Sequence, residues 1–327
     1  MQHCTAIFGE VFAKHEMDLH TESAARIRIA RAGVPAGVEI VMPEPATEAD
    51  LERVHLPSYI RMIRELSSYG GIRYIDPNTY VTADSFDVAS HAAGAGIQAA
   101  GLALSGVPSF ALGRPPGHHA EPDQAMGFCL FNNAAVAAAW ALTRVRRVAI
   151  IDWDLHHGNG TQKIFYGTDR VLYCSIHKVN SFPRTGWVDE IGTGPGRGFN
   201  VNAPIREGGS ISDYRRVFEE VFSDVIGRFE PDLVIVSAGQ DPLSDDPIGG
   251  MLLTPGDFAL LTSIILDSAR SPLALVLEGG YGPSLGLAVT SIFHALTGEM
   301  PDRRDLEPGK ARESTERIIS ELRAILI

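Results

Sequence analysis

The chemically richest stretch of the chain is RVAIIDWDLHHGNG, residues 147–160. It begins with a continuous apolar run, which is typical of a strand buried on both faces of a sheet. Four polar side chains follow within six positions: Asp152, Asp154, His156 and His157. In extended backbone Asp154 and His156 point to the same side, where they could bind one divalent metal ion. By itself the segment is equally compatible with a polar turn that caps the next helix.

The same arrangement recurs along the chain: a short apolar run, a cluster of reactive residues and then a helical pattern. SFALG leads to His118 and His119, and RVAIID leads to Asp154 and His156. RVLYCSI leads to His177 and Lys178. PDLVIVSAG leads to Gln240 and Asp241, and LALVLEGG leads to Tyr281. Strands that alternate with helices predict an α/β fold, with a mostly parallel central sheet flanked by helices. Because the carboxyl ends of parallel strands meet at one edge, we expect the active site there.

No internal repeat or low-complexity linker interrupts the 327 residues, which favours a single domain over residues 1–327. Near the start, TESAARIRIARAG predicts a helix capped by Thr21 and ended by Gly33. The turn-rich segment 74–86 is expected to be exposed, and an alanine- and glycine-rich helix is expected over about 87–104. The last thirty residues, which contain EPGKARESTERIISELRAIL, predict a surface loop followed by an amphipathic helix.

Composition and charge narrow the classes of function. The formal net charge of −12 argues against direct nucleic-acid binding, which needs a basic surface, and it is compatible with a cationic substrate. Cys4, Cys129 and Cys174 form no CxxC pair, so neither a disulfide framework nor a thiolate zinc site is indicated. No signal peptide is recognisable, and the longest apolar run, 134–142, is too short to span a bilayer. These features predict a cytoplasmic protein without membrane insertion.

Asp154, His156 and Asp241 together would supply one imidazole and two carboxylates to a metal ion. Three protein ligands leave coordination positions open, which is expected of a catalytic rather than a structural zinc site. His118 and His119 follow RPPG, whose prolines restrict the backbone, and they are the candidate acid–base groups.

Three more residues are candidates for supporting roles. Asp152 and Asn159 could each hold one imidazole by its outer nitrogen and so set its tautomer and basicity. Tyr281 follows two glycines and could donate a hydrogen bond to a developing oxyanion. From these residues alone, a tyrosine packed in a turn on the sheet is the simpler interpretation of Tyr281.

Together these segments resemble the arginase-like deacetylase superfamily, which includes zinc-dependent histone deacetylases and bacterial acetylpolyamine amidohydrolases. The matching pieces are RPPGHHA, GFCLFNN, VAIIDWDLHHGNGTQ, SIHK, EIGTGPGRGFNVN, SAGQD, DDPIGGMLLTP and LEGGY. They lie in the family's order between Arg114 and Tyr281, with weaker likeness at HTES and AAGAG. Asn159 and the glutamate of LEGGY are similar to the class II branch.

The resemblance implies a hydrolase of linear amides that uses Zn²⁺, with Fe²⁺ as the alternative, bound by Asp154, His156 and Asp241. His119 would be the general base that activates the water and later protonates the amine, and His118 would be its electrostatic partner. The resemblance also implies that Asp152 supports His118 and that Asn159 supports His119. Tyr281 would donate a hydrogen bond to the scissile carbonyl.

The resemblance also implies a substrate tunnel and a second cation. Gly127 would contact the substrate through its backbone, and Phe128 and Phe182 would line a slot for the acyl-lysine chain. A structural K⁺ held mostly by backbone oxygens is implied near Asp152, Asp154, His156 and Ser175.

Three positions depart from the family pattern. Gln240 stands where an aromatic residue is common in class II, and Pro242 follows the metal-binding aspartate, so both could reshape the pocket rim. Ile248 occupies the position of a glutamate in polyamine-selective class II members, and it offers no partner to a second ammonium group. We therefore expect small acyl groups to be removed from a primary amine such as acyl-lysine, with acetylpolyamines or small acetylated metabolites as alternatives.

Two other functions compete with the deacetylase hypothesis. A ureohydrolase of the same fold with two manganese ions would need additional bridging aspartates, and the tandem histidines and LEGGY argue against it. A catalytically silent binding module would be favoured if a metal ligand, His119 or Tyr281 were replaced, and none of them is. An oligomer is compatible with the sequence.

Overall fold

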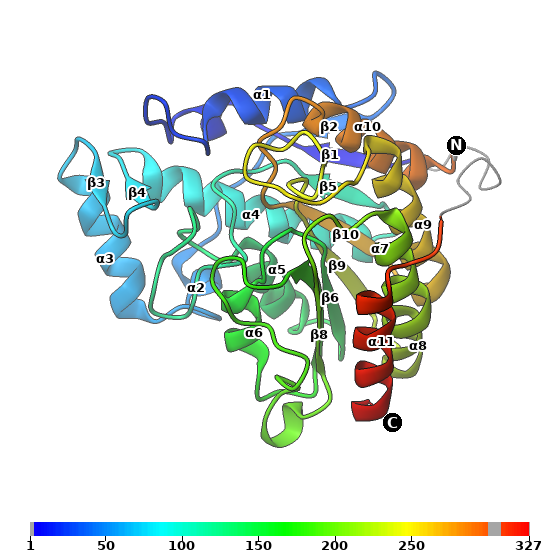
Figure 1. Cartoon of the computed structure of the whole chain (residues 1–327). Coiled ribbons are helices and arrows are strands. Elements are labelled where there is room, and N and C mark those ends of the chain that lie inside the picture. Colours follow the sequence, from blue (N-terminus) through cyan, green and yellow to red (C-terminus); the bar gives the residue numbers. More distant parts are fainter. Residues whose placement is uncertain (1–2, 300–308, 327) are drawn as a thin grey trace.

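The computed structural model describes residues 3–299 and 309–326. Within them, parallel strands form one eight-stranded sheet (Figure 1). Its strands, in spatial order, are β2 (Glu39–Val41), β1 (Thr5–Ile7), β5 (Ser109–Ala111), β10 (Leu273–Leu277), β9 (Leu233–Ala238), β6 (Val148–Asp152), β7 (Val171–Lys178) and β8 (Asn200–Ile205). The predicted α/β fold is confirmed, and all five apolar runs quoted above form strands of this sheet.

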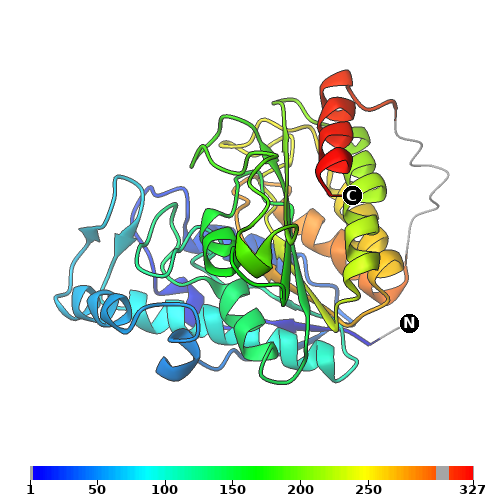
Figure 2. The same ribbon diagram turned by 90° about the horizontal axis from the view of Figure 1, so that it is seen from below.

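Helices cover both faces of the sheet, and the helices are α1 (Ala24–Ala32), α2 (Glu48–Leu51), α3 (Pro57–Ser68), α4 (Ser85–Leu104), α5 (Asn133–Ala141), α6 (Asn159–Phe165), α7 (Ile211–Val217), α8 (Ser223–Phe229), α9 (Pro255–Ala269), α10 (Leu285–Thr297) and α11 (Glu313–Ile325). α4, α5 and α6 lie on one face and α7 to α10 on the other (Figures 1 and 2). α11 packs beside the edge strand β8. Single helical turns are η1 (Glu10–Ala13), η2 (Gly194–Gly196) and the π turn η3 (Phe218–Phe222), and β3 (Arg73–Tyr74) and β4 (Tyr80–Val81) form a separate antiparallel pair.

Burial on both faces explains why the central strands are continuous apolar runs. Every residue of β6 and of β9 is buried, and Trp153, directly after β6, packs against Phe258 of α9 with ring centroids 6.0 Å apart. A second apolar cluster joins α3, β4 and α5 on the outer side of α4. The sheet edge that carries the site therefore rests on a rigid core.

Local sequence signals define several of the helix ends. The Asn132 side chain accepts a hydrogen bond from the Ala135 N–H at the start of α5, and Thr254 forms a capping box before α9. α1 ends at Gly33 as predicted, and α11 is the expected amphipathic helix, with Ile319 and Leu322 buried.

Two expectations for the first ninety residues were wrong. α1 begins at Ala24 with Ser23 at its N-cap, so Thr21 does not cap it. The segment 74–86 is only partly exposed, because Thr79, Tyr80, Val81 and Ser85 are buried. Val81 belongs to the second cluster, and the Tyr80 ring stacks on His15. A single domain over residues 1–327 stays a prediction, because residues 1–2, 300–308 and 327 lie outside the described part of the chain.

Candidate active site

The candidate site lies where the chain changes direction across the sheet. From β6 the chain runs outward through β7 to β8 and then returns to β9, on the other side of β6. Ligand sites of open α/β sheets lie at such a switch point, beyond the carboxyl ends of the strands. Asp154 and His156 follow β6, Asp241 follows β9, and Tyr281 follows β10.

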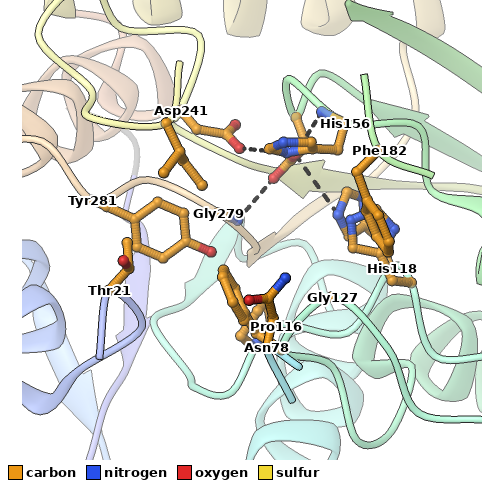
Figure 3. A pocket seen from close by; sticks show the side chains of 14 residues that line it. Thr21, Asn78, Pro116, His118, Gly127, His156, Phe182, Asp241, Gly279 and Tyr281 are labelled. Atoms are coloured by element: carbon orange, nitrogen blue, oxygen red, sulfur yellow. Dashed lines mark hydrogen bonds and ion pairs between the residues drawn. The ribbon is translucent and has the colours of Figure 1, made fainter. Parts of the chain in front are cut away.

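Asp154, His156 and Asp241 come together in the lining of one pocket, and Figure 3 shows His156 and Asp241 side by side there. His156 Nδ1 lies 3.3 Å from an Asp154 oxygen and 3.0 Å from an Asp241 oxygen. The other oxygen of each carboxylate accepts a backbone N–H, from Gly279 at 2.8 Å for Asp154 and from Leu155 at 2.8 Å for Asp241. The potential ligand atoms all lie within 4.8 Å of one another.

The electrostatics of this group fit a cation. Burial and the neighbouring Asp154 together raise the pKa of Asp241 to about 7, against the opposing effect of His156. Burial alone would lower the pKa of His156, but hydrogen bonds to Asp154 and Asp241 raise it to about 9. Two buried carboxylates this close repel each other unless positive charge lies between them. One imidazole and two carboxylates suit a borderline divalent ion, so the group is able to hold a metal.

The tandem histidines lie beside the acidic group and differ in their partners. His118 Nδ1 donates to Asp152 at 3.1 Å, and Asp152 also accepts from the Tyr173 hydroxyl at 2.9 Å. His119 Nδ1 lies 2.8 Å from the Asn159 side-chain oxygen. The two imidazoles thus have different supports, an anion behind His118 and a neutral amide behind His119.

Their pKa values are accordingly driven apart. Burial would lower the pKa of His118, but Asp154 and Asp152 outweigh it and raise that pKa to about 10. Burial lowers the pKa of His119 well below its ordinary value, and His118 and His156 lower it further. Adjacent groups with opposite pKa shifts are a common feature of sites that move protons.

Tyr281 faces the histidines from the opposite wall of the pocket (Figure 3). Its backbone N–H donates to Asp246 at 2.6 Å. Arg26 donates through Nε to the Gly280 carbonyl at 2.7 Å, and its guanidinium lies 5.0 Å from the centre of the Tyr281 ring. Tyr281 is therefore held on both its backbone and its ring.

The predicted tunnel residues Gly127, Phe128, Phe182 and Ile248 line the same cavity of about 280 Å³. The Phe128 ring packs edge to face on Tyr281 and the Phe182 ring on His119, at centroid distances of 5.8 and 5.0 Å. A β-carbon on Gly127, whose φ is 57°, would lie 2.4 Å from the His119 ring. Only glycine therefore allows the chain this close to the imidazole.

Several residues of the site were missed by local sequence reasoning. Thr21, Asn78, Pro116 and Gly279 also line the pocket, and the buried Glu278 accepts hydrogen bonds from the Gly117 N–H at 2.6 Å and the His118 N–H at 3.1 Å. LEGGY was a signal for Glu278, whereas nothing around Thr21 or Asn78 indicated a pocket wall.

The residues predicted to lie near a potassium ion belong to β6, β7 and the turn after β6. Asp152 and Ser175 are paired across β6 and β7, and the Ser175 hydroxyl lies 2.9 Å from His177 Nδ1. The K⁺ site near Asp152, Asp154, His156 and Ser175 stays a prediction. In the described part of the chain no helix is long and apolar enough to cross a membrane; the cytoplasmic location likewise stays a prediction.

Fold and site together define an α/β enzyme with a candidate metal centre at the switch point of its sheet. The family model of the histone deacetylase domain matches residues 20–296. The chain is similar to the crystal structure of the HDA15 HD domain, with a TM-score of 0.92 at 33% identity over 100% of this chain and 95% of that one. The chain therefore belongs to the histone deacetylase family.

Relatives come from several kingdoms. A probable deacetylase of Archaeoglobus fulgidus is 38% identical over 301 residues, which cover 88% of this chain and 83% of the relative. A histone deacetylase-like amidohydrolase of Pseudomonas aeruginosa is 38% identical over 291 residues, 85% of this chain and 76% of the relative. Histone deacetylase HDA1 of Candida albicans is 36% identical over 90% of this chain, which spans only 40% of that longer protein. The predicted family resemblance is confirmed.

Proposed function

We propose that the chain is a metal-dependent amidohydrolase that removes acetyl or short acyl groups from a primary amine such as acyl-lysine. The observation that carries this proposal is the convergence of Asp154, His156 and Asp241 in the lining of one pocket that Tyr281 also lines. The names of the relatives, deacetylase and amidohydrolase, support the same class of reaction.

A divalent ion, Zn²⁺ or Fe²⁺, bound by Asp154, His156 and Asp241 would supply Lewis acidity for the attacking water and the scissile carbonyl. His119 would take the proton of the water and pass it to the departing amine, because its low pKa keeps it neutral and able to accept. His118, held by Asp152, would stay protonated and contribute positive charge.

Tyr281 would donate its phenolic hydrogen to the oxygen of the substrate carbonyl as negative charge develops there. The aromatic rings of Phe128 and Phe182 would flank the alkyl chain of the substrate, and Ile248 would extend the apolar wall toward the rim. A slot of this kind excludes water from the reacting amide.

Two features of the chain bear on the choice of substrate beyond the acylated amine. Ile248 favours acyl-lysine, because a rim without a carboxylate does not select a second ammonium group. The net charge of −12 keeps an acetylpolyamine or another small cationic amide as the alternative.

Replacing one of the proposed metal ligands tests the proposed centre. Asp241→Ala removes one of three ligands, so it should lose both bound metal and turnover of an acetyl-lysine peptide, since two side chains hold zinc poorly. Metal content is measured on the purified protein by elemental analysis. Full metal occupancy in the variant would contradict the ligand assignment, and a parent enzyme that turns over no acylated amine would favour a silent binding module.

A further inference from the structure

We propose that Glu121 is a positioning residue that selects the tautomer of His119 through the side-chain amide of Asn159. The inference rests on the proposed role of His119 as the general base. It concerns a difference between the two histidines of the site. His118 has a carboxylate, Asp152, behind its Nδ1, whereas His119 has an amide.

An amide behind a histidine does not define the histidine's tautomer by itself. A carboxylate only accepts hydrogen bonds, so Asp152 requires a hydrogen on Nδ1 of His118. An asparagine can present its oxygen or, after a half turn, its NH₂ group. With the oxygen toward His119, Nδ1 carries the hydrogen and Nε2 is free to accept a proton. With the NH₂ group toward His119, Nδ1 must accept, and the hydrogen moves to Nε2.

The groups around Asn159 decide between these two states. Its Nδ2 lies 2.9 Å from a Glu121 carboxylate oxygen, 3.3 Å from the Met126 sulfur and 3.5 Å from the His119 carbonyl oxygen, and all three are acceptors. The NH₂ group must therefore face Glu121, and the Asn159 oxygen must face His119 Nδ1, which lies 2.8 Å away. The nearest of these acceptors, and the charged one, is Glu121, which makes it the dominant one.

Hydrogen bonds fix both the side chain and the backbone of Glu121. Its second oxygen accepts from Lys163 Nζ at 2.5 Å, and its side chain is only 15% exposed, against 53% for Lys163. Asn159 and Lys163 stand one helical turn apart on α6, so Glu121 reaches two neighbouring side chains of one helix. The Glu121 backbone is fixed as well, by its N–H donating to the Gln124 carbonyl at 2.9 Å and by its carbonyl lying 3.0 Å from His55 Nδ1.

A charge-swapped double variant separates this role from that of an ordinary surface ion pair. Glu121→Lys with Lys163→Glu keeps two opposite charges together but places a donor-only ammonium beside Asn159, which should turn its amide over. We expect His119 to change from the Nδ1–H to the Nε2–H tautomer. kcat should fall by about 10² or more with little change in KM, because a general base contributes about 10²–10⁴.

The tautomer is read from the ¹⁵N chemical shifts of the ring in histidine-labelled protein, with the His119 signals assigned by their loss in His119→Gln. Two single variants grade the effect. Glu121→Leu removes the acceptor and should lower kcat by about 10–100-fold, whereas Glu121→Gln can still present an oxygen and should lose less. The matched control is Asp123→Asn, because Asp123 lies 3.6 Å from Lys163 in the same charge cluster; it should keep the parental tautomer and kcat.

The outcomes separate this inference from the proposed function. If the swapped variant keeps the Nδ1–H tautomer and parental kcat, Glu121 serves only the ion pair and the inference fails. If the swapped protein does not fold, the tautomer and kcat of Glu121→Leu decide in the same way. A parent without turnover on any acylated amine would refute the proposed function, while the ring shifts would still report whether Glu121 controls His119.

Discussion

The Tyr281 hydroxyl allows a test of the mechanism at a single atom. Burial raises the pKa of Tyr281 well above its ordinary value of 10.0, so the phenol keeps its hydrogen and remains a donor. The ring is held without the hydroxyl, by Arg26 at 5.0 Å and by Phe128 at a centroid distance of 5.8 Å. Tyr281→Phe should therefore remove the donor and leave the ring in place. Loss of one oxyanion donor costs about 10²–10³ in kcat, or about 2.7–4 kcal/mol, and we expect a fall of that size.

Three measurements on Tyr281→Phe define the test: kcat on the best acyl substrate, metal content and the melting temperature. Metal content should stay parental, because the Tyr281 phenol is not one of the three candidate metal ligands, Asp154, His156 and Asp241. The melting temperature should change little, because the hydroxyl points into the pocket rather than into the core (Figure 3). Asp241→Ala is the contrasting variant, since it should lose metal together with activity. A phenylalanine variant with near-parental kcat would reduce Tyr281 to a packed turn residue.

Three further outcomes are expected. The buried Glu22 accepts hydrogen bonds from Arg114 at 2.5 and 2.7 Å. Glu22→Gln should therefore lower the free energy of unfolding, measured in urea, by about 3–5 kcal/mol. An unchanged urea midpoint would contradict this. Although burial opposes it, Arg114 and Arg26 lower the pKa of Glu22 from 4.5 to about 2. The stabilisation of the folded protein by ionised Glu22 is then complete above about pH 5 and is lost as the pH falls toward 2. The free energy of unfolding should therefore fall less steeply with decreasing pH in Glu22→Gln than in the parent. In a substrate panel, acetyl-lysine peptides should match acetylspermidine in kcat/KM; a preference for acetylspermidine of about 100-fold or more would overturn the role given to Ile248.

The sequence alone determined those parts of the site that depend on neighbouring residues. The apolar run of β6 shows where a buried strand ends, and Asp154 and His156 stand directly beyond that end, so the sequence predicts that both lie at the same edge of the sheet. That they share a side comes from the bend of the chain over residues 154–156, not from strand alternation. The parallel sheet follows from the alternation of such runs with helices, and it predicts that Asp241 and Tyr281 reach the same edge. These inferences need only periodicity, strand direction and the chemistry of each side chain.

Only the tertiary structure decided the contacts between segments that are remote in the chain. Arg26 lies in a helix whose arginines look alike in the sequence, yet it alone among them bonds the Gly280 carbonyl, 254 positions away. Thr21 was expected to cap that helix and lines the pocket instead. Asn159 was recognised as a partner of His119, but the direction of its amide depends on Glu121, 38 positions away. Such contacts follow from how whole layers pack against one another, because packing joins surfaces whose complementarity no local pattern in the sequence records.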